Sequence, residues 1–137
     1  MNKRPSFEGF DDPQTTNTHQ DIQLSPQERE HKKIAIRSAN DVFRRTLTGG
    51  DIFTTSGVAS LGLEANLELM EMVRTFTDFH PNNDPYGEHD FGSFEFNCQK
   101  FYWKIDYYDH ELREGSPDPA NPACTRRVLT IMLAEEY

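Results

Sequence analysis

The stretch FGSFEFNCQKFYWKIDYY, residues 91–108, carries the clearest structural signal in the chain. Two runs rich in aromatic residues flank Asn97-Cys98, a pair that can form a two-residue turn although cysteine is not the usual choice there. In this register Glu95 pairs with Lys100, and an opposite-charge pair across two strands is stabilising. The stretch therefore predicts an antiparallel β-hairpin with strands at residues 91–96 and 99–108.

The same register assigns a face to each side chain of the hairpin, because side chains alternate along a strand. Trp103 lies opposite Gly92, and an aromatic ring over a glycine supports the register. The predicted core face carries Phe94, Phe96, Phe101, Trp103 and Ile105, and the other face, which should be wet, carries Glu95, Lys100, Tyr102, Lys104 and Asp106.

Downstream of the hairpin, a proline-rich loop at residues 114–122 precedes the C-terminal segment. Asn121-Pro122 predicts the start of a last helix that continues to about Glu135. Arg126 and Arg127 fall in its first turn, where the helix dipole disfavours cations, so we expect both to have carboxylate partners elsewhere. The predicted core face of this helix is Val128, Leu129, Met132 and Leu133.

Upstream, a first helix has a well-defined start. Ser25 can cap it, Pro26 suits the first helical position, and Glu28 completes a capping box. The helix should continue to about Thr46, before a Gly-Gly stop. Its predicted apolar face is Ile36, Ala39, Val42, Phe43 and Leu47.

Between this helix and the hairpin, the sequence predicts one strand and one more helix. Residues 51–55 (DIFTT) follow the Gly-Gly pair and are rich in β-formers, which predicts a short strand. Residues 63–76 have apolar side chains at helical spacing, which predicts a second helix. Its predicted buried stripe is Leu63, Leu67, Met70, Val73 and Phe76, broadened by Leu69 and Met72.

These elements occur in the order α-β-α-β-β-α. The economical assembly is an α+β fold, a small three-stranded, largely antiparallel sheet packed by three helices. We expect residues 25–137 to form a single domain. Residues 1–24 are polar and show no helical or strand period, which predicts a disordered or loosely docked tail that Phe7 and Phe10 could anchor.

Composition excludes several classes of function. The 137 residues carry a formal net charge of −9, which argues against a general nucleic-acid binder and against an anionic membrane surface as partner. No apolar run approaches the length of a membrane span, and residues 1–24 lack the apolar core of a secretory signal. Two cysteines exclude a disulfide scaffold and a zinc cluster, and no phosphate-loop, dinucleotide or serine-hydrolase motif occurs.

Four segments are similar to a known family: FRRTLTGG (43–50), NNDPYGEHDFGSFEF (82–96), WKIDYYD (103–109) and SPDPANPACTRRVLTIMLAEEY (116–137). Together they resemble a family of small bacterial proteins known only as a domain of unknown function, whose genes are common on plasmids, prophages and other mobile regions. The resemblance covers about residues 34–137 and implies a bacterial, cytoplasmic protein, without implying an activity, a substrate or a catalytic residue. Family members tend to carry Asp-Gly at the hairpin turn, where this chain has Asn97-Cys98.

Candidate reactive side chains gather in the loop at residues 80–90 and at the end of the hairpin. In the predicted register His89 faces Asp106, so the start of one strand meets the end of the other. Carboxylates and imidazoles at one rim could bind Mg²⁺ or Mn²⁺ or act as general acid and base. A structural loop of turn-building side chains and a partner-binding rim remain as alternatives. The cluster is His80, Asn82, Asp84, Glu88, His89, Asp90, Asp106, Asp109, His110 and Glu111.

The acidity suggests a first functional hypothesis. Residues 78–118 hold three basic and ten acidic side chains together with most of the aromatic residues, a combination that fits a basic protein partner. We therefore expect a small acidic protein-binding module without catalysis or cofactor. Taken with the resemblance to mobile-element proteins, one version is an inhibitor whose carboxylates imitate phosphates on a nucleic-acid-binding host protein. The expected binding residues are Tyr86, Glu88, Asp90, Glu95, Tyr102, Asp106, Tyr108, Asp109 and Glu111.

Two other hypotheses remain. A metal-dependent hydrolase would use His89, Asp90, Asp106 and Asp109, with Mg²⁺ or Mn²⁺ held by the first three. A homo-oligomer would place the basic first helix of one subunit on the acidic block of another.

Overall fold

The computed structural model describes residues 24–137. The expected tail at residues 1–24, with Phe7 and Phe10, therefore lies outside the described residues except for Leu24.

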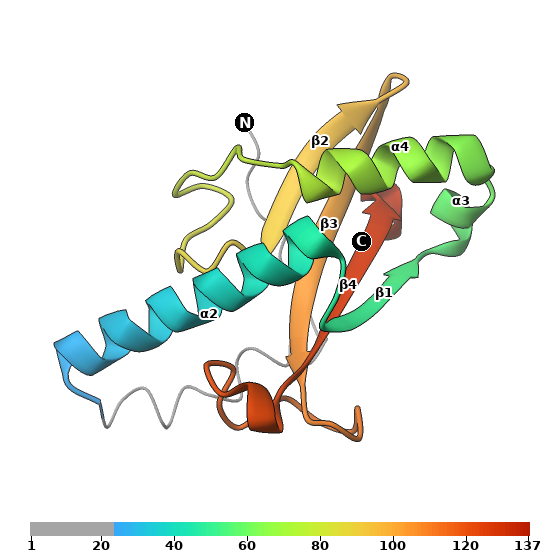
Figure 1. The fold of residues 1–137 in the computed structure, drawn as a ribbon. Coiled ribbons are helices and arrows are strands. Elements are labelled where there is room, and N and C mark those ends of the chain that lie inside the picture. The colour runs from blue at the N-terminus through green and yellow to red at the C-terminus, as the bar shows by residue number, and fades with distance from the viewer. Residues whose placement is uncertain (1–23) are drawn as a thin grey trace.

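The described chain forms an α+β fold in which helices lie against one face of a four-stranded sheet (Figure 1). The strand order is β1-β4-β3-β2, with β1 parallel to β4 and the other neighbours antiparallel. The elements in chain order are α2 (Pro26–Thr46), β1 (Gly50–Thr54), α3 (Ser56–Ala59), α4 (Leu63–Arg74), β2 (Phe91–Phe96), β3 (Gln99–Tyr108), the short 3₁₀ helix η2 (Pro122–Cys124), β4 (Arg126–Leu133) and the 3₁₀ helix η3 (Ala134–Glu136).

The largest correction concerns the C-terminal segment. We predicted a helix there and a three-stranded, largely antiparallel sheet; the segment is β4, and the sheet has four strands in mixed order. Only the short turn η2 follows Asn121, which does cap it through the side chain. The strand lies between β1 and β3 and is buried on both faces. Its sequence therefore lacks the alternation of apolar and polar residues that is typical of a strand with one exposed face. Length and periodicity alone do not separate such a run from a buried helix.

The hairpin prediction is confirmed in bounds and in register. Glu95 pairs with Lys100, and Gly92 pairs with Trp103, whose ring leaves no room for a side chain at that glycine. Both turn residues have positive φ, 49° at Asn97 and 62° at Cys98, which is the geometry of the preferred two-residue hairpin turn.

The turn makes a testable prediction, because a Cβ atom disfavours the left-handed backbone at Cys98. We expect Cys98→Gly to raise the free energy of unfolding by about 0.5–1 kcal/mol. Urea denaturation of the full chain measures the change. Cys98→Ser is the matched control, since it removes the thiol and keeps the Cβ atom, and equal gains from both variants would contradict this account.

The first helix begins as predicted, with a capping box between Ser25 and Glu28. It ends at Thr46, as predicted, and its C-cap is Leu47, with a φ of 55°, two to three residues before the glycines that we expected to stop it. Val42, predicted to face the core, is 61 % exposed. Its place on the buried side is taken by two polar residues, Asn40 and Arg44, which are fully buried.

The second predicted helix is α4, which ends at Arg74, two residues earlier than expected. Val73 is buried as predicted, and Leu69 joins it in the core. Leu63 and Leu67 face outward, which corrects the predicted stripe. None of the described helices combines the length and apolar content needed to cross a membrane.

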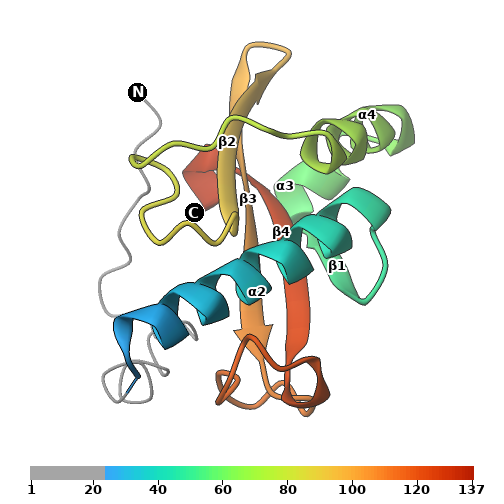
Figure 2. The ribbon, with the colours of Figure 1, turned by 60° about the vertical axis from the view of Figure 1, so that its left-hand side comes forward.

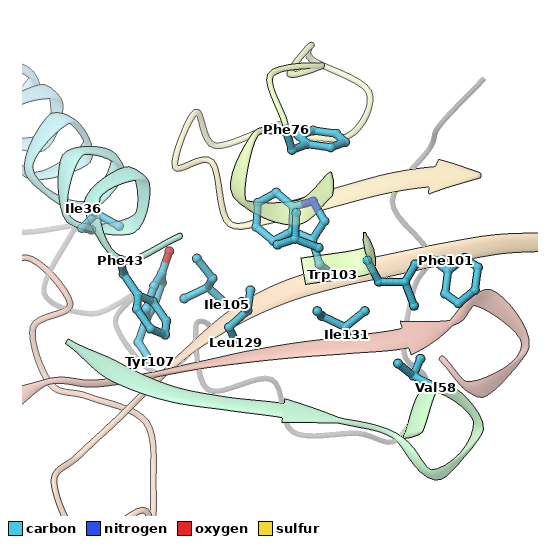
Figure 3. Packing of buried hydrophobic residues seen from close by; sticks show 12 residues of the cluster. Ile36, Phe43, Val58, Phe76, Phe101, Trp103, Ile105, Tyr107, Leu129 and Ile131 are labelled. Atoms are coloured by element: carbon cyan, nitrogen blue, oxygen red, sulfur yellow. The ribbon is translucent and has the colours of Figure 1, made fainter. Parts of the chain in front are cut away.

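The hydrophobic core lies between the helices and one face of the sheet, called here the helix face (Figure 3). Phe101, Trp103, Ile105 and Tyr107 supply the β3 side chains on it, in agreement with the predicted core face. The opposite face of the sheet, called here the far face, carries Asp106 and its neighbours. We expected all five predicted side chains on this face to be exposed to solvent. Of these, Glu95 and Lys100 are exposed, Tyr102 and Lys104 are half-buried, and Asp106 is buried.

Candidate functional site

The predicted His-carboxylate cluster is divided into separate groups by the structure. β2 begins at Phe91, opposite Lys104, so β3 continues past it as far as Tyr108. Asp109 therefore lies about 16 Å further along β3 than the start of β2, at roughly 3.3 Å per residue. Asp106 lies on the far face, where its carboxylate contacts Lys104 Nζ at 2.6 Å. The expected pairing of His89 with Asp106 does not occur in the ladder, because β2 starts two residues later.

His89 is held on the helix face by two carboxylates: Asp84, a member of the predicted cluster, and Asp41, which the sequence did not associate with it. Its Nδ1 lies 2.9 Å from Asp41 Oδ1 on α2, and its Nε2 lies 3.7 Å from Asp84 Oδ2. Its ring stacks on Phe79 with a centroid separation of 3.8 Å and an interplanar angle of 5°. Asp84 is mostly buried and accepts backbone hydrogen bonds from Glu88 and His89, which is the turn-building role considered above. The imidazole is thus a link between α2 and the loop.

A buried hydrogen-bond network surrounds Asn40 in the middle of α2. The Asn40 Nδ2 atom donates to Tyr107 Oη at 2.7 Å and to the Glu88 carbonyl at 2.9 Å. Its Oδ1 atom accepts from Arg127 Nε at 2.7 Å. Tyr107 in turn donates to Glu88 Oε1 at 2.8 Å. One amide therefore joins α2, β3, β4 and the loop that precedes β2.

The network changes the titration of its members. Burial raises the pKa of Tyr107 well above 10, and the negative charges of Asp90 and Glu88 raise it further. Burial lowers the pKa of Arg127, against the attraction of Tyr107 and Glu88. Arg127 has amide and carbonyl partners, Asn40 and Pro119, instead of the carboxylate that we expected for it. Arg126 does have the expected carboxylate partner, since its Nε atom lies 2.5 Å from Asp51 Oδ2.

The raised pKa of Tyr107 predicts a loss of stability in alkali. The unfolded chain releases this proton at a pH of about 10, whereas the folded chain keeps it, so the stabilisation is complete below pH 10 and is lost as the pH rises through the folded pKa. We expect the free energy of unfolding to fall less steeply above pH 10 in Tyr107→Phe than in the wild type. Denaturation at pH 9 to 11 measures the slope. Tyr86→Phe, at an exposed tyrosine, is the control and should keep the wild-type slope.

Arg44 forms a second buried polar centre beside this network. Its Nη1 atom donates to the carbonyls of Val73 (2.9 Å), Arg74 (3.2 Å) and Phe76 (2.9 Å), which caps the C-terminal end of α4. Its guanidinium also pairs with Asp41, and it lies 5.3 Å from the centre of the Trp103 ring. Burial lowers the pKa of this arginine, and the bond to Asp41 opposes that effect.

The remaining members of the predicted His-carboxylate cluster lie beyond the end of β3. Asp109 Oδ1 accepts from the Arg113 backbone nitrogen at 3.0 Å, Glu111 pairs with Arg113, and His110 Nε2 lies 2.8 Å from the Ala123 carbonyl oxygen. These residues and Cys124 line an open depression of about 590 Å³. Within residues 24–137, no group of three or more His, Cys, Asp or Glu side chains is arranged to hold a metal ion.

The predicted partner-binding residues are therefore scattered. Three are exposed, namely Tyr86, Glu95 and Glu111; four are half-buried, namely Glu88, Tyr102, Tyr108 and Asp109; and two are buried, namely Asp90 and Asp106. Of the other cluster members, His80 is half-buried, Asn82 is exposed, and Asp84 is buried. The basic side of α2 binds its own chain, since Lys32 pairs with Asp118 and Arg37 reaches the Gly87 carbonyl.

Sequence reasoning missed the α2 half of this site, which comprises Asn40, Asp41 and Arg44. A signal was available: Asn40 and Arg44 follow Ile36 at intervals of four residues, which places polar side chains on an apolar helical stripe. Polar side chains in a buried stripe imply buried partners.

The fold and this site define a class: a small mixed-sheet α+β domain whose buried arginine side chains are held by Asp41, Asn40 and backbone carbonyl oxygens. Residues 54–136 match the model of the family described as protein of unknown function, DUF3768, and the chain belongs to this family. The resemblance to a family of unknown function is thereby confirmed over residues 54–136, and FRRTLTGG lies before the matched residues. No curated protein and no solved structure matches the chain.

Proposed function

We propose that this protein is a non-catalytic binding module whose partner presents a basic surface with apolar contacts. The observation that carries the proposal is the outward side of α4. Leu63 is 77 % exposed and Leu67 is 62 % exposed, one helical turn apart, and the exposed Glu64 and Glu68 lie beside them. These four residues are called here the α4 outer stripe.

The α4 outer stripe has the chemistry of a docking surface. Burying an exposed leucine side chain gains about 1.5–3 kcal/mol, so a partner that covers both leucines gains substantial affinity. The two glutamates have no ion-pair partner among residues 24–137, so they are available to a cationic partner. The net charge of −9 adds long-range attraction for such a partner and repulsion for nucleic acid.

The α4 outer stripe replaces the loop and hairpin residues as the proposed partner-binding surface. Glu88 bonds to Tyr107, and Asp106 pairs with Lys104 inside the fold, so these carboxylates serve stability. Tyr86, Glu95 and Glu111 remain exposed. Tyr86 and Glu95 can add contacts at the edge of an interface.

A narrower version of the proposal concerns the partner. Carboxylates that take the place of phosphates would suit a nucleic-acid-binding protein, and the resemblance to mobile-element proteins motivates an inhibitor of a host defence or regulatory protein. We propose a cytoplasmic setting, which the two free cysteines Cys98 and Cys124 support.

Capture experiments with matched variants test the proposal. The tagged full chain is incubated with lysate of the source organism at low and high salt, and retained proteins are quantified by mass spectrometry. We expect a basic protein to be enriched at low salt and released at high salt, because exposed charges are screened. Its retention should fall about tenfold or more in E64K/E68K and in L63S/L67S.

Two controls separate the stripe from general charge and apolarity. E111K/E114K makes the same change in net charge at exposed residues beyond β3, and V42S removes an exposed apolar side chain from α2. Both controls should retain the partner. An empty capture at low salt, or equal retention by all variants, would contradict the proposed function.

A further inference from the structure

β1 forms one border of the described sheet, with β4 as its neighbour on the inner side (Figures 1 and 2). The hydrogen bond from the Thr55 nitrogen to the Ile131 oxygen, 3.1 Å long, fixes the direction in which the backbone groups of β1 point. Because this direction alternates from one residue to the next, the N–H and C=O groups of Phe53 face β4, and those of Ile52 and Thr54 point away from the sheet. The backbone groups of Ile52 and Thr54 are called here the β1 edge.

Among the described residues, the β1 edge lacks the features by which folded proteins commonly protect such a border, namely proline, lysine or a covering helix. Residues 50–54 read GDIFT, an ordinary length for a strand, and contain neither proline nor lysine. α3 follows β1 but turns inward, since its Val58 is fully buried in the core (Figure 3). Phe53, on the far face of β1, is 54 % exposed. Within residues 24–137, the border therefore offers unpaired backbone groups beside an exposed aromatic side chain.

We propose that the β1 edge pairs with the β1 edge of a second copy of this chain, antiparallel and about a two-fold axis, so that the two sheets become one. An exposed sheet edge is a template for a further strand, and a two-fold axis uses the same edge in both copies. The interface is separate from the proposed function, because the α4 outer stripe lies on a helix and not at the border of the sheet. It also differs from the oligomer considered from the sequence, which used the first helix and the acidic block.

The direction of the backbone groups limits the possible registers. Antiparallel pairing must bring outward groups together, so the two-fold axis can pass beside Asp51, Ile52 or Phe53. An axis at Asp51 would place like charges directly opposite each other, which is destabilising. An axis at Ile52 would place Asp51 opposite the Phe53 ring of the other copy. An axis at Phe53 instead pairs the two exposed rings on the far face and sets Ile52 opposite Thr54 of the other copy, so we assign the axis to Phe53.

The charges at the two ends of β1 agree with this axis. Asp51, near the start of the strand, pairs with Arg126 at 2.5 Å, and Thr55, after its end, donates to Glu136 at 2.5 Å. The hydrogen bond from Thr55 lowers the pKa of Glu136, so this side chain is charged at neutral pH. With the axis at Phe53, Asp51 lies opposite Thr55 of the other copy. Arg126 of each copy is thereby brought toward Glu136 of the other, and opposite charges meet at both ends of the interface.

The oligomeric state of the full chain tests the proposal. Light scattering after size-exclusion chromatography measures the mass of the particle at several chain and salt concentrations. Because the interface is small, we expect a dimer that dissociates on dilution. Salt should strengthen this dimer, because it screens the repulsion between two chains of net charge −9, whereas salt should release the basic partner proposed above.

Substitutions at Phe53 test the register. Phe53→Lys places two lysines opposite each other at the axis, so we expect the dissociation constant of the dimer to rise about tenfold or more. An equal mixture of F53K and F53E should associate again, because opposite charges then face each other. Val42→Lys makes the same change in charge at an α2 position that is 61 % exposed, and it should leave the dimer intact. A dimer retained by F53K would overturn the assigned axis.

Disulfide cross-linking gives a second readout that does not depend on the stability of F53K. With the proposed axis, the two Phe53 residues form a non-hydrogen-bonded pair, whose Cα atoms lie about 4.5 Å apart, within the range that a disulfide spans. In a C98S/C124S background, Phe53→Cys should form a covalent dimer with oxidised glutathione about tenfold or more faster than Val42→Cys. A full chain that stays monomeric under all these conditions, or an F53C chain that cross-links no faster than V42C, overturns the proposal.

Discussion

Replacing Arg44 with methionine should lower the free energy of unfolding by about 3–5 kcal/mol, the largest effect we expect from a single substitution. Methionine keeps much of the apolar stem and removes the guanidinium. The carbonyls of Val73 and Phe76 then lose a buried donor at 2.9 Å, and each unsatisfied buried group costs about 1–3 kcal/mol. Since small domains are stable by only about 5–15 kcal/mol, the variant should be close to unfolding at room temperature.

The adjacent residue is the matched control for this prediction. Arg45 follows Arg44 on α2 and is exposed, so Arg45→Met should change the free energy of unfolding by no more than about 0.5 kcal/mol. Urea denaturation followed by circular dichroism compares the two variants with the wild type. Similar midpoints for Arg44→Met and Arg45→Met would show that the buried guanidinium does not secure the end of α4.

Gly92→Ala should lower the free energy of unfolding by about 2–3 kcal/mol, because the new methyl group has no space. A Cβ atom at this position would lie 2.2 Å from Trp103 Nε1 and 2.8 Å from Phe76 Cζ. The indole is fully buried, so it cannot turn away without disturbing the core. Thermal or urea denaturation measures the loss.

A double-mutant cycle separates this clash from a general loss of glycine. Trp103→Leu opens the space beside Gly92, so Gly92→Ala should cost about 1–2 kcal/mol less in that background. Additive effects of the two substitutions would contradict the account of a steric clash.

The hairpin and the start of α2 could be predicted because each depends on residues close in sequence. Ser25 and Glu28 form their capping box across one helical turn. The register of the hairpin follows from a two-residue turn at Asn97-Cys98 and from the alternation of its side chains.

The candidate site could be predicted only in part. The loop residues His89 and Asp84 do lie close together, at 3.7 Å, but the nearer carboxylate partner of His89 is Asp41, 48 residues away in the chain. Proximity along the hairpin suggested Asp106 instead, and Asp106 lies on the other face of the sheet. A register argument locates residues along a strand, but it does not show which helix will supply the buried partner.

By itself, the sequence determined the local elements up to the end of the hairpin except the four-residue helix α3, together with the acidic charge that disfavours nucleic acid as a ligand. Tertiary structure decided that the C-terminal segment is a central strand, because its backbone groups pair with β1 on one side and β3 on the other, and local sequence does not identify these partners. It also decided which charges are available to a partner. Buried polar groups must be paired or hydrogen-bonded, so Asp41 pairs with Arg44, the Glu88 side chain of the loop accepts from Tyr107, and the α4 outer stripe remains on the surface.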